Sequence, residues 1–417
     1  MTSKSVIVIG SGISGLVSAI LARKKGHNVK LITYGQGALA VAGGIIDLIG
    51  YDYNGKLIEN PLEYIKTLPC KHPYSLIGVD HIKQGVEAFL QICKECNYEY
   101  LGSPLKNQMV LTAVGTLKPT CLTPKTIDGS LLSRHKRFCV VGFDILKDFF
   151  VDIVVESLKR HYGDEKIIDS INVKLNMQTG VEYRDISALD VARLLDDKIG
   201  FLNVVEQLKQ KGGDDTLFIM PPVISEKPSY DVYKKLKEYT KGSFIEVSAI
   251  PPSVTGYRLD VMLLNYAKSL GVEVIEKSKV AGSTIDNGHC LSVYTQGVDR
   301  DREYKADAFI LATGGVFGGG LNACIGSMYE PIFKLPIKVP QNQQEWSNQY
   351  LFEGQEQKFA TFGISTNENL QIVNDENEVL IDNVYVVGRS LQGYDFCFEK
   401  SGNGVAICSA YHAVEQL

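Results

Sequence analysis

The feature that most constrains this chain is a glycine-rich turn directly after a short apolar run near the N-terminus. Val6–Ile9 predicts a buried strand, Ile13–Lys25 predicts a helix, and Asn28–Ile32 predicts a second strand. Three glycines with G-x-G-x-x-G spacing lie in and just after the first turn: Gly10, Gly12 and Gly15. This order of strand, turn, helix and strand predicts a Rossmann-like βαβ unit.

The spacing of the turn residues predicts a site for a phosphate-bearing cofactor. Gly10 permits the tight turn, Gly12 lets a phosphate approach the backbone, and Gly15 lets the helix pack against the strand. The N-terminus of the helix, where Ser14 lies, offers free N–H groups and the positive end of the helix dipole. A single turn of this kind is a weak signal, because many tight strand–helix turns share it.

The end of the second predicted strand departs from the usual pattern. Units that bind FAD or NAD commonly place Asp or Glu about 20 residues past the glycines, where the carboxylate holds the adenosine ribose. Here that position is Thr33, and neither Ile32 nor Tyr34 supplies a carboxylate. FMN has a phosphate but no adenosine, so we expect FMN. FAD is the alternative, because a threonine hydroxyl can still bond a ribose.

A second glycine-rich tract predicts part of the same site. The stretch 35–48 is dense in small residues, including Gly43 and Gly44, yet it also carries apolar side chains. Small residues allow close backbone approach to a ligand. We expect a packed wall beside the cofactor rather than a flexible loop.

Two further strand ends carry the remaining glycines. The predicted strand Phe309–Ala312 runs into an A-T-G-G sequence, which looks like the second signature of two-dinucleotide-binding flavoproteins. The predicted strand Asn383–Val387 ends at Gly388, followed by Arg389 where FAD enzymes commonly place Asp, and the closing helix is expected at Val405–Glu415. The predicted cofactor residues at these ends are Thr313, Gly314, Gly315, Gly388, Gly402 and Gly404.

Two residues are candidates for catalysis. His72 lies in a predicted turn, where it could act as a base, although a turn histidine is more often a local cap. Arg258 follows a Pro- and Gly-rich stretch and is expected at the mouth of a helix predicted at Leu259–Leu270. A guanidinium there would suit a phosphate, with a surface salt bridge as the alternative.

The length of 417 residues is too great for one core and predicts more than one lobe. We expect an α/β fold of the FAD/NAD(P)-binding flavoprotein type with an inserted α/β cap or substrate domain. The flavin-binding domain is expected to be discontinuous, at 1–96, 250–330 and 365–417. The inserted domain is expected at 97–249 and 331–364.

Charge and cysteine usage restrict the partners. A net charge of −5 gives no reason to expect a nucleic acid. The nine cysteines show no disulfide or metal-binding framework; the single C-x-x-C, Cys93 to Cys96, lies on a predicted helix, so no metal is expected. No segment supplies the ~18–20 uninterrupted apolar residues of a membrane span. We expect a soluble, cytoplasmic chain.

Several longer strings resemble the B subunits of anaerobic glycerol-3-phosphate dehydrogenases, and the similarity runs nearly end to end. The two most specific strings are H-P-Y-S-L-I-G at 72–78 and P-P-S-V-x-G-x-R-L at 251–259. Others include G-Q-G-A-L at 35–39, D-L at 47–48 and the closing segment 402–410.

This resemblance implies an FMN-binding oxidoreductase subunit that works with an FAD-bearing catalytic A subunit and an iron–sulfur C subunit. The implied reaction oxidises sn-glycerol 3-phosphate to dihydroxyacetone phosphate and passes electrons to a quinone. The chain would then reach the inner face of the membrane only through its partners. The alternative is a flavin-carrying relay or assembly subunit without a substrate site of its own.

Overall fold

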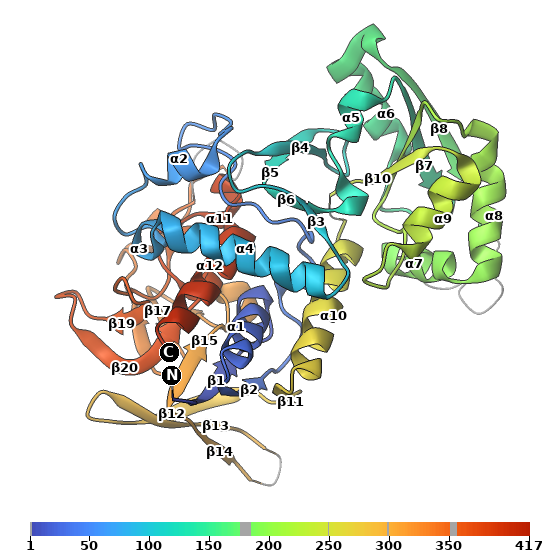
Figure 1. Ribbon diagram of the computed structural model, residues 1–417. Helices are drawn as coiled ribbons and strands as arrows, with labels where there is room; N and C mark the ends of the chain where they lie inside the picture. The colour runs from blue at the N-terminus through green and yellow to red at the C-terminus, as the bar shows by residue number, and fades with distance from the viewer. Residues whose placement is uncertain (1, 176–184, 249, 298–299, 351–356) are drawn as a thin grey trace.

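The chain folds into two lobes, each with its own parallel sheet and its own buried core (Figure 1). The computed structural model describes residues 2–175, 185–248, 250–297, 300–350 and 357–417. Both termini lie in the larger lobe, close to each other, and the smaller lobe lies at the upper right of the view.

The larger lobe is built on a six-stranded sheet with the order β11-β2-β1-β15-β20-β19. Its strands are β1 (Ser5–Ile9), β2 (Asn28–Ile32), β11 (Glu273–Ile275), β15 (Ala308–Leu311), β19 (Gln371–Val373) and β20 (Val379–Val386). All neighbouring strands pair in parallel except β19, which runs antiparallel to β20. The carboxyl ends of the five parallel strands therefore share one edge, where open α/β sheets bind ligands.

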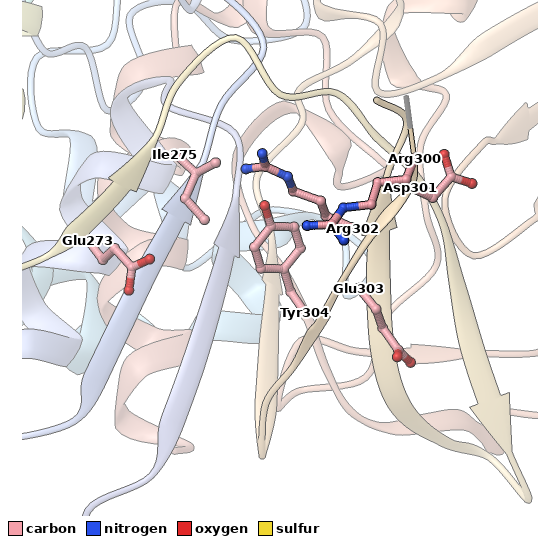
Figure 2. Close-up of a pocket in the computed structure, with 7 residues that line it drawn as sticks. All are labelled: Glu273, Ile275, Arg300, Asp301, Arg302, Glu303 and Tyr304. Carbon is pink, nitrogen blue, oxygen red and sulfur yellow. The ribbon is translucent and has the colours of Figure 1, made fainter. Parts of the chain in front are cut away.

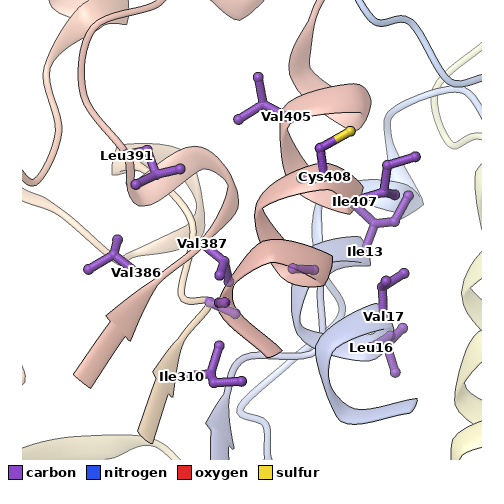
Figure 3. Close-up of a cluster of buried hydrophobic side chains, with 14 of the residues drawn as sticks. Ile13, Leu16, Val17, Ile310, Val386, Val387, Leu391, Val405, Ile407 and Cys408 are labelled. Carbon is purple, nitrogen blue, oxygen red and sulfur yellow. The ribbon is translucent and has the colours of Figure 1, made fainter. Parts of the chain in front are cut away.

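The larger lobe also holds α-helices of two lengths. The longer ones are α1 (Ile13–Lys24), α4 (Val79–Glu95), α10 (Val254–Ser269) and α12 (Gly402–Glu415), and the short ones are α2 (Pro61–Ile65), α3 (Pro73–Ile77) and α11 (Phe396–Glu399). Helix α12 packs against both α1 and α4. Figure 3 shows α1 and α12 side by side next to the strands, with Leu16, Ile310, Val386 and Ile407 in one buried cluster.

The larger lobe also contains smaller antiparallel sheets. Antiparallel ladders are formed by β12 (Val280–Asp286), β13 (His289–Thr295) and β14 (Arg302–Lys305), and by β16 (Asn322–Cys324), β17 (Ser327–Glu330) and β18 (Leu335–Ile337). Two hairpin-like pairs, β3 (Tyr100–Gly102) with β6 (Leu122–Pro124) and β4 (Gln108–Leu111) with β5 (Leu117–Thr120), lie between the lobes in Figure 1.

The smaller lobe holds a four-stranded parallel sheet with the order β10-β9-β7-β8. Its elements are β7 (Arg137–Phe143), β8 (Ile167–Val173), β9 (Thr216–Met220), β10 (Ser243–Glu246), α5 (Leu131–Arg134), α6 (Val151–Tyr162), α7 (Ala188–Asp196), α8 (Lys198–Leu208) and α9 (Asp231–Thr240). A separate apolar core lies among them. The α/β class expected for this insertion is confirmed by these elements.

The segment 331–364 packs differently from the insertion with which it was grouped. Ile332, Leu335, Trp346 and Phe362 are buried in the core of the larger lobe. Residues 351–356 of that segment lie outside the described part of the chain. The domain boundaries as a whole stay a prediction, but the described residues of this stretch contribute to the core of the larger lobe.

Two predicted helices begin at the wrong residue. Helix α10 starts at Val254 rather than at Leu259, because the Ser253 hydroxyl accepts a hydrogen bond from the Gly256 N–H (3.1 Å) and caps the helix before the glycine. Arg258 therefore lies in the second turn of α10 and not at its mouth. The predicted closing helix likewise begins earlier, at Gly402 instead of Val405.

Candidate functional site

The two glycine-rich strand ends, far apart in sequence, lie next to each other. Strand β1 pairs with β15 in parallel, with Ile9 opposite Leu311, so Gly10 and Ala312 leave the sheet side by side. Gly10 has φ +107°, and a Cβ there would overlap the Ala312 carbonyl oxygen. A side chain at this position is therefore excluded both by backbone conformation and by the neighbouring strand end.

The N-terminus of α1 is not capped by a side chain. Gly12 is its N-cap, and its first turn carries no acidic residue. A Cβ added at Gly12 would meet nothing within 4 Å, in contrast to Gly15, where it would overlap the Gly10 carbonyl oxygen. Free N–H groups, a positive dipole end and open space are what a phosphate needs.

The strand ends of β2 and β20 complete this part of the edge. The Thr33 hydroxyl lies 2.6 Å from the Ser11 hydroxyl and donates to the Gly35 carbonyl at 2.9 Å. Gly388 follows β20 with φ +70°, and a Cβ there would lie 2.6 Å from Ser14 Oγ. The Gly388 N–H donates to Ser409 Oγ on α12 (2.9 Å), which ties the strand end to the closing helix.

The wall predicted at 35–48 lies against the start of α12. The Gly404 N–H donates to the Asp47 carbonyl at 3.0 Å, and Asn403 Nδ2 donates to the carbonyl oxygen of Ile45 at 2.8 Å and that of Gly43 at 3.4 Å. The Gly44 N–H donates to Thr255 Oγ1 of α10 at 3.2 Å. The stretch is thus packed between two helices, and Gly402 lies in the first turn of α12.

Apart from others elsewhere in the fold, such as Ser18 Oγ and Thr126 Oγ1, three buried polar atoms without partners lie at this edge. They are Thr313 Oγ1 after β15, Arg389 Nη1 after β20 and Asp47 Oδ1 beside α12, and none has a hydrogen-bond partner among the described residues. Unpaired buried polar atoms are unfavourable unless a ligand or water satisfies them. Together with the open space at Gly12, they fit a polar, phosphate-bearing cofactor such as a flavin.

His72 is placed as a buried capping residue. It is the N-cap of α3, where its Nδ1 accepts a hydrogen bond from the Tyr74 N–H at 3.1 Å. Its Nε2 lies 3.1 Å from Glu399 Oε2, and the residue is 1% exposed. The ring stacks on Tyr74, whose pKa is raised well above its ordinary value by burial. Both ring nitrogens therefore have partners inside the protein.

Arg258 is also engaged within the fold. Its Nη1 and Nη2 donate to the two carboxylate oxygens of Glu246, each at 2.7 Å, and its Nε donates to the Ser225 carbonyl at 2.6 Å. Burial lowers the pKa of Arg258, but the Glu246 carboxylate outweighs this and raises the pKa above the ordinary value. The guanidinium of Arg258 is thus engaged by acceptors from the smaller lobe.

Two polar groups at the edge were not assigned from the sequence. Asp47 forms an ion pair with Lys118 of β5 (Oδ2 to Nζ, 2.8 Å), two residues that nothing in the sequence connects. Arg389 was recognised as a departure from the usual acidic residue but was given no role. That departure was the available signal, because a reversed charge at this position changes which groups it can bind.

Two surface pockets are also present. One, of about 480 Å³, opens between β11 and β14 and is lined mostly by charged side chains, among them Glu273, Arg300 and Arg302 (Figure 2). The other, of about 490 Å³, lies between the β4–β5 pair and α6 and includes Met109, Tyr162 and Lys166. Neither contains any predicted cofactor residue, so the glycine-lined edge is the better candidate on its chemistry.

The described part of the chain shows neither a metal-binding cluster nor a membrane-spanning helix. Within the described ranges, no group of three or more His, Cys, Asp or Glu side chains is placed to hold a metal ion. Cys93 is buried in α4, and burial raises its pKa well above the ordinary value, as for an inert structural thiol. None of the described helices is both long and apolar enough to cross a membrane.

Comparison with known proteins gives the family. The sequence profile of a family described as an FAD binding domain matches residues 5–405. This match supports a flavin, FAD in particular, and gives no support to the FMN expected from Thr33. A crystal structure of 3-ketosteroid delta1-dehydrogenase from Sterolibacterium denitrificans is 10% identical, with a TM-score of 0.49 over 100% of this chain and 99% of that one.

Relatives match along their whole length. The B subunit of anaerobic glycerol-3-phosphate dehydrogenase from Vibrio cholerae is 30% identical over 426 residues, which cover 100% of this chain and 97% of the relative. The protein of the same name from Vibrio vulnificus is 29% identical, with coverage of 100% and 96%. The chain therefore belongs to the family of anaerobic glycerol-3-phosphate dehydrogenase B subunits and is a flavin-dependent oxidoreductase subunit.

Proposed function

We propose that this chain binds FAD at the glycine-lined edge and takes part in oxidising sn-glycerol 3-phosphate to dihydroxyacetone phosphate, with the electrons passed to a quinone. The observation that carries the cofactor site is the parallel pairing of β1 with β15, which brings Gly10 and the Thr313–Gly315 turn together. The substrate comes from the printed name of full-length relatives.

The residues at the edge have separate tasks in this proposal. The α1 N-terminus, with Gly12 and Ser14, would hold a phosphate through its N–H groups. The turns at Thr313–Gly315 and at Gly388 would let the cofactor lie against bare backbone. The first turn of α12, with Gly402 and Gly404, would direct its positive dipole end at the flavin ring.

Gly43 and Gly44 would form the wall opposite α12, and Thr33 would face the adenosine half of FAD through its hydroxyl. When bound, the flavin supplies the acceptor for a hydride from C2 of the substrate. FMN is the alternative cofactor, because Thr33 lacks the charge of the usual ribose ligand.

We also propose one residue for proton transfer and one for binding the substrate phosphate. His72 would take the hydroxyl proton and Arg258 would bind the substrate phosphate, as the sequence suggested. Both side chains are buried with partners in this structure, so each role would require its present contacts to open. The competing account is that His72 caps α3 and Arg258 joins the two lobes.

The burial of His72 and Arg258 favours a second function. If neither residue contacts substrate, this chain would carry flavin as an electron relay or assembly subunit, and a partner would hold the substrate. The partners implied by the resemblance are an FAD-bearing A subunit and an iron–sulfur C subunit. Attachment to the inner face of the membrane would then come through these partners.

Two measurements test the proposal on the purified full-length chain. Extraction of the bound flavin and its mass spectrum should give FAD; FMN would support the argument from Thr33, and absence of any flavin after incubation with both would overturn the cofactor site. Anaerobic addition of glycerol 3-phosphate should bleach the flavin absorbance. Bleaching only after the FAD-bearing partner is added would favour the relay.

A further inference from the structure

The side chain of Arg389 packs against two aromatic rings, and its hydrogen bonding is incomplete. Its guanidinium carbon lies 4.7 Å from the centre of the Phe396 ring and 5.5 Å from that of Tyr394. Its Nη2 donates to the Ala360 carbonyl oxygen. Its Nη1 is buried and has no partner among the described residues. The two N–H groups of Nη1 are thus left without an acceptor among these residues.

The acidic side chains nearest in sequence are committed elsewhere. Asp395 accepts hydrogen bonds from the N–H groups of Cys397 and Phe398 and from that of Gln357. Glu399 contacts His72 and Ser401. Among the residues that the structure describes, no carboxylate forms an ion pair with Arg389. An acceptor for the buried Nη1 must therefore come from beyond these described residues, because a buried charged donor without one is strongly unfavourable.

Arg389 lies beside the glycine turn that follows β15. Its Cγ is 3.1 Å and its Nε 3.6 Å from the position that a Cβ of Gly315 would occupy. The Ser390 hydroxyl next to it donates to the Gly314 carbonyl at 3.1 Å. Thr313 Oγ1, which follows the end of β15, is also buried and has no hydrogen-bond partner among the described residues. Two unpaired polar groups therefore follow β15 and β20, where these paired strands end.

We propose that Arg389 binds an anionic oxygen of the bound flavin, either on its phosphate or on the pyrimidine edge of the reduced ring. This inference rests on the proposed flavin site. Phe396 and Tyr394 act as positioning residues that hold the guanidinium plane by cation–π contact. Charge-assisted hydrogen bonds from such a prearranged group strengthen binding of the anion more than neutral ones do.

The test uses the full-length chain stripped of flavin and titrated with FAD, FMN and riboflavin. We expect Arg389→Gln to raise the Kd for FAD by about tenfold or more, the size typical of losing a hydrogen bond to a charged group. Arg389→Lys should restore part of the affinity. Arg134→Gln, an exposed arginine of the smaller lobe, is the matched control and should change nothing.

The three flavins distinguish the two sources of the anionic oxygen. Loss confined to FAD and FMN locates the contact on the phosphate. Loss shared by riboflavin, together with a lower midpoint potential, locates it on the ring, because the reduced anion would lose its cationic partner. Unchanged affinity and unchanged potential in a folded Arg389→Gln variant overturn the inference.

Folding is controlled separately. If Arg389→Gln does not fold, Arg389→Lys and Phe396→Leu serve in its place, and both should raise the Kd for FAD. Unchanged Kd values in these folded variants overturn the inference and leave the proposed function standing. A wild-type chain that binds none of the three flavins overturns the proposed function, and this inference with it.

Discussion

Arg258 and Glu246 form a bidentate ion pair that joins the two lobes. Arg258 lies on α10, which packs against α1 of the larger lobe, and Glu246 ends β10 in the sheet of the smaller lobe. The side chains are 1% and 0% exposed. Glu246 Oε1 also accepts the Ile224 N–H at 2.8 Å, so both carboxylate oxygens have hydrogen-bond donors.

Removing one partner of this pair should be strongly destabilising. Arg258→Met leaves a buried carboxylate without its cation, and we expect the free energy of unfolding to fall by about 3–5 kcal/mol. The double variant Arg258→Met with Glu246→Leu removes both charges and should recover most of that loss. Urea unfolding followed by circular dichroism measures both. A stable Arg258→Met protein with a raised KM for glycerol 3-phosphate would instead favour the phosphate-binding role.

The role of His72 can be tested with a variant that still caps helix α3. Asn is a good N-cap residue, so His72→Asn should preserve the bond to the Tyr74 N–H while losing the contact with Glu399. If the role is structural, the melting temperature falls and kcat is unchanged. Loss of a general base would lower kcat by about 10²–10⁴-fold. Steady-state kinetics of the complete complex, beside a thermal melt, separates the two.

The local parts of the fold were predictable because their signals lie within short stretches of sequence. The βαβ unit at the N-terminus was confirmed nearly residue for residue, since strand, glycine turn and helix follow one another directly. The adjacency of β1 and β15 followed from two recognisable glycine signatures, although Ile9 and Ala308 lie far apart in the sequence.

The environment of Arg258 could not be predicted in this way. Its partner Glu246 precedes it by 12 residues but lies on a strand of the other lobe, and no periodicity relates the two. The early start of α10 was missed because Pro251 and Pro252 suggested a loop, which hid the cap at Ser253. Long-range pairing of single polar side chains leaves no local pattern, whereas glycine turns do.

Gly12 offers a test of the phosphate site that leaves the fold intact. A methyl group at Gly12 meets nothing within 4 Å, so Gly12→Ala should melt near the wild-type temperature. It should still weaken flavin binding, because the methyl group occupies the space through which a phosphate reaches the backbone. Gly10→Ala is the contrasting variant and should misfold. A Gly12→Ala protein with wild-type flavin affinity would contradict the assignment of the phosphate to α1.

The raised pKa of the buried Glu330 carboxyl group predicts that the free energy of unfolding depends on pH. This carboxyl group is 0% exposed at the end of β17 and accepts hydrogen bonds from the N–H groups of Ile332 (2.9 Å) and Phe333 (2.7 Å). Burial raises its pKa from 4.5 to about 7, against the opposing effect of those two bonds. The folded protein therefore holds the proton more tightly than the unfolded chain does.

The sign of the effect follows from this tighter proton binding. The stabilisation is fully present below pH 4.5 and is lost as the pH rises through about 7, which amounts to on the order of 3 kcal/mol by pH 8. Glu330→Gln cannot ionise, so its unfolding free energy should change less between pH 5 and pH 8 than that of the wild type. Asp260, whose pKa burial raises to about 6, titrates in both proteins and cancels in the difference. Parallel pH profiles for the two proteins would show that Glu330 stays ionised in the fold.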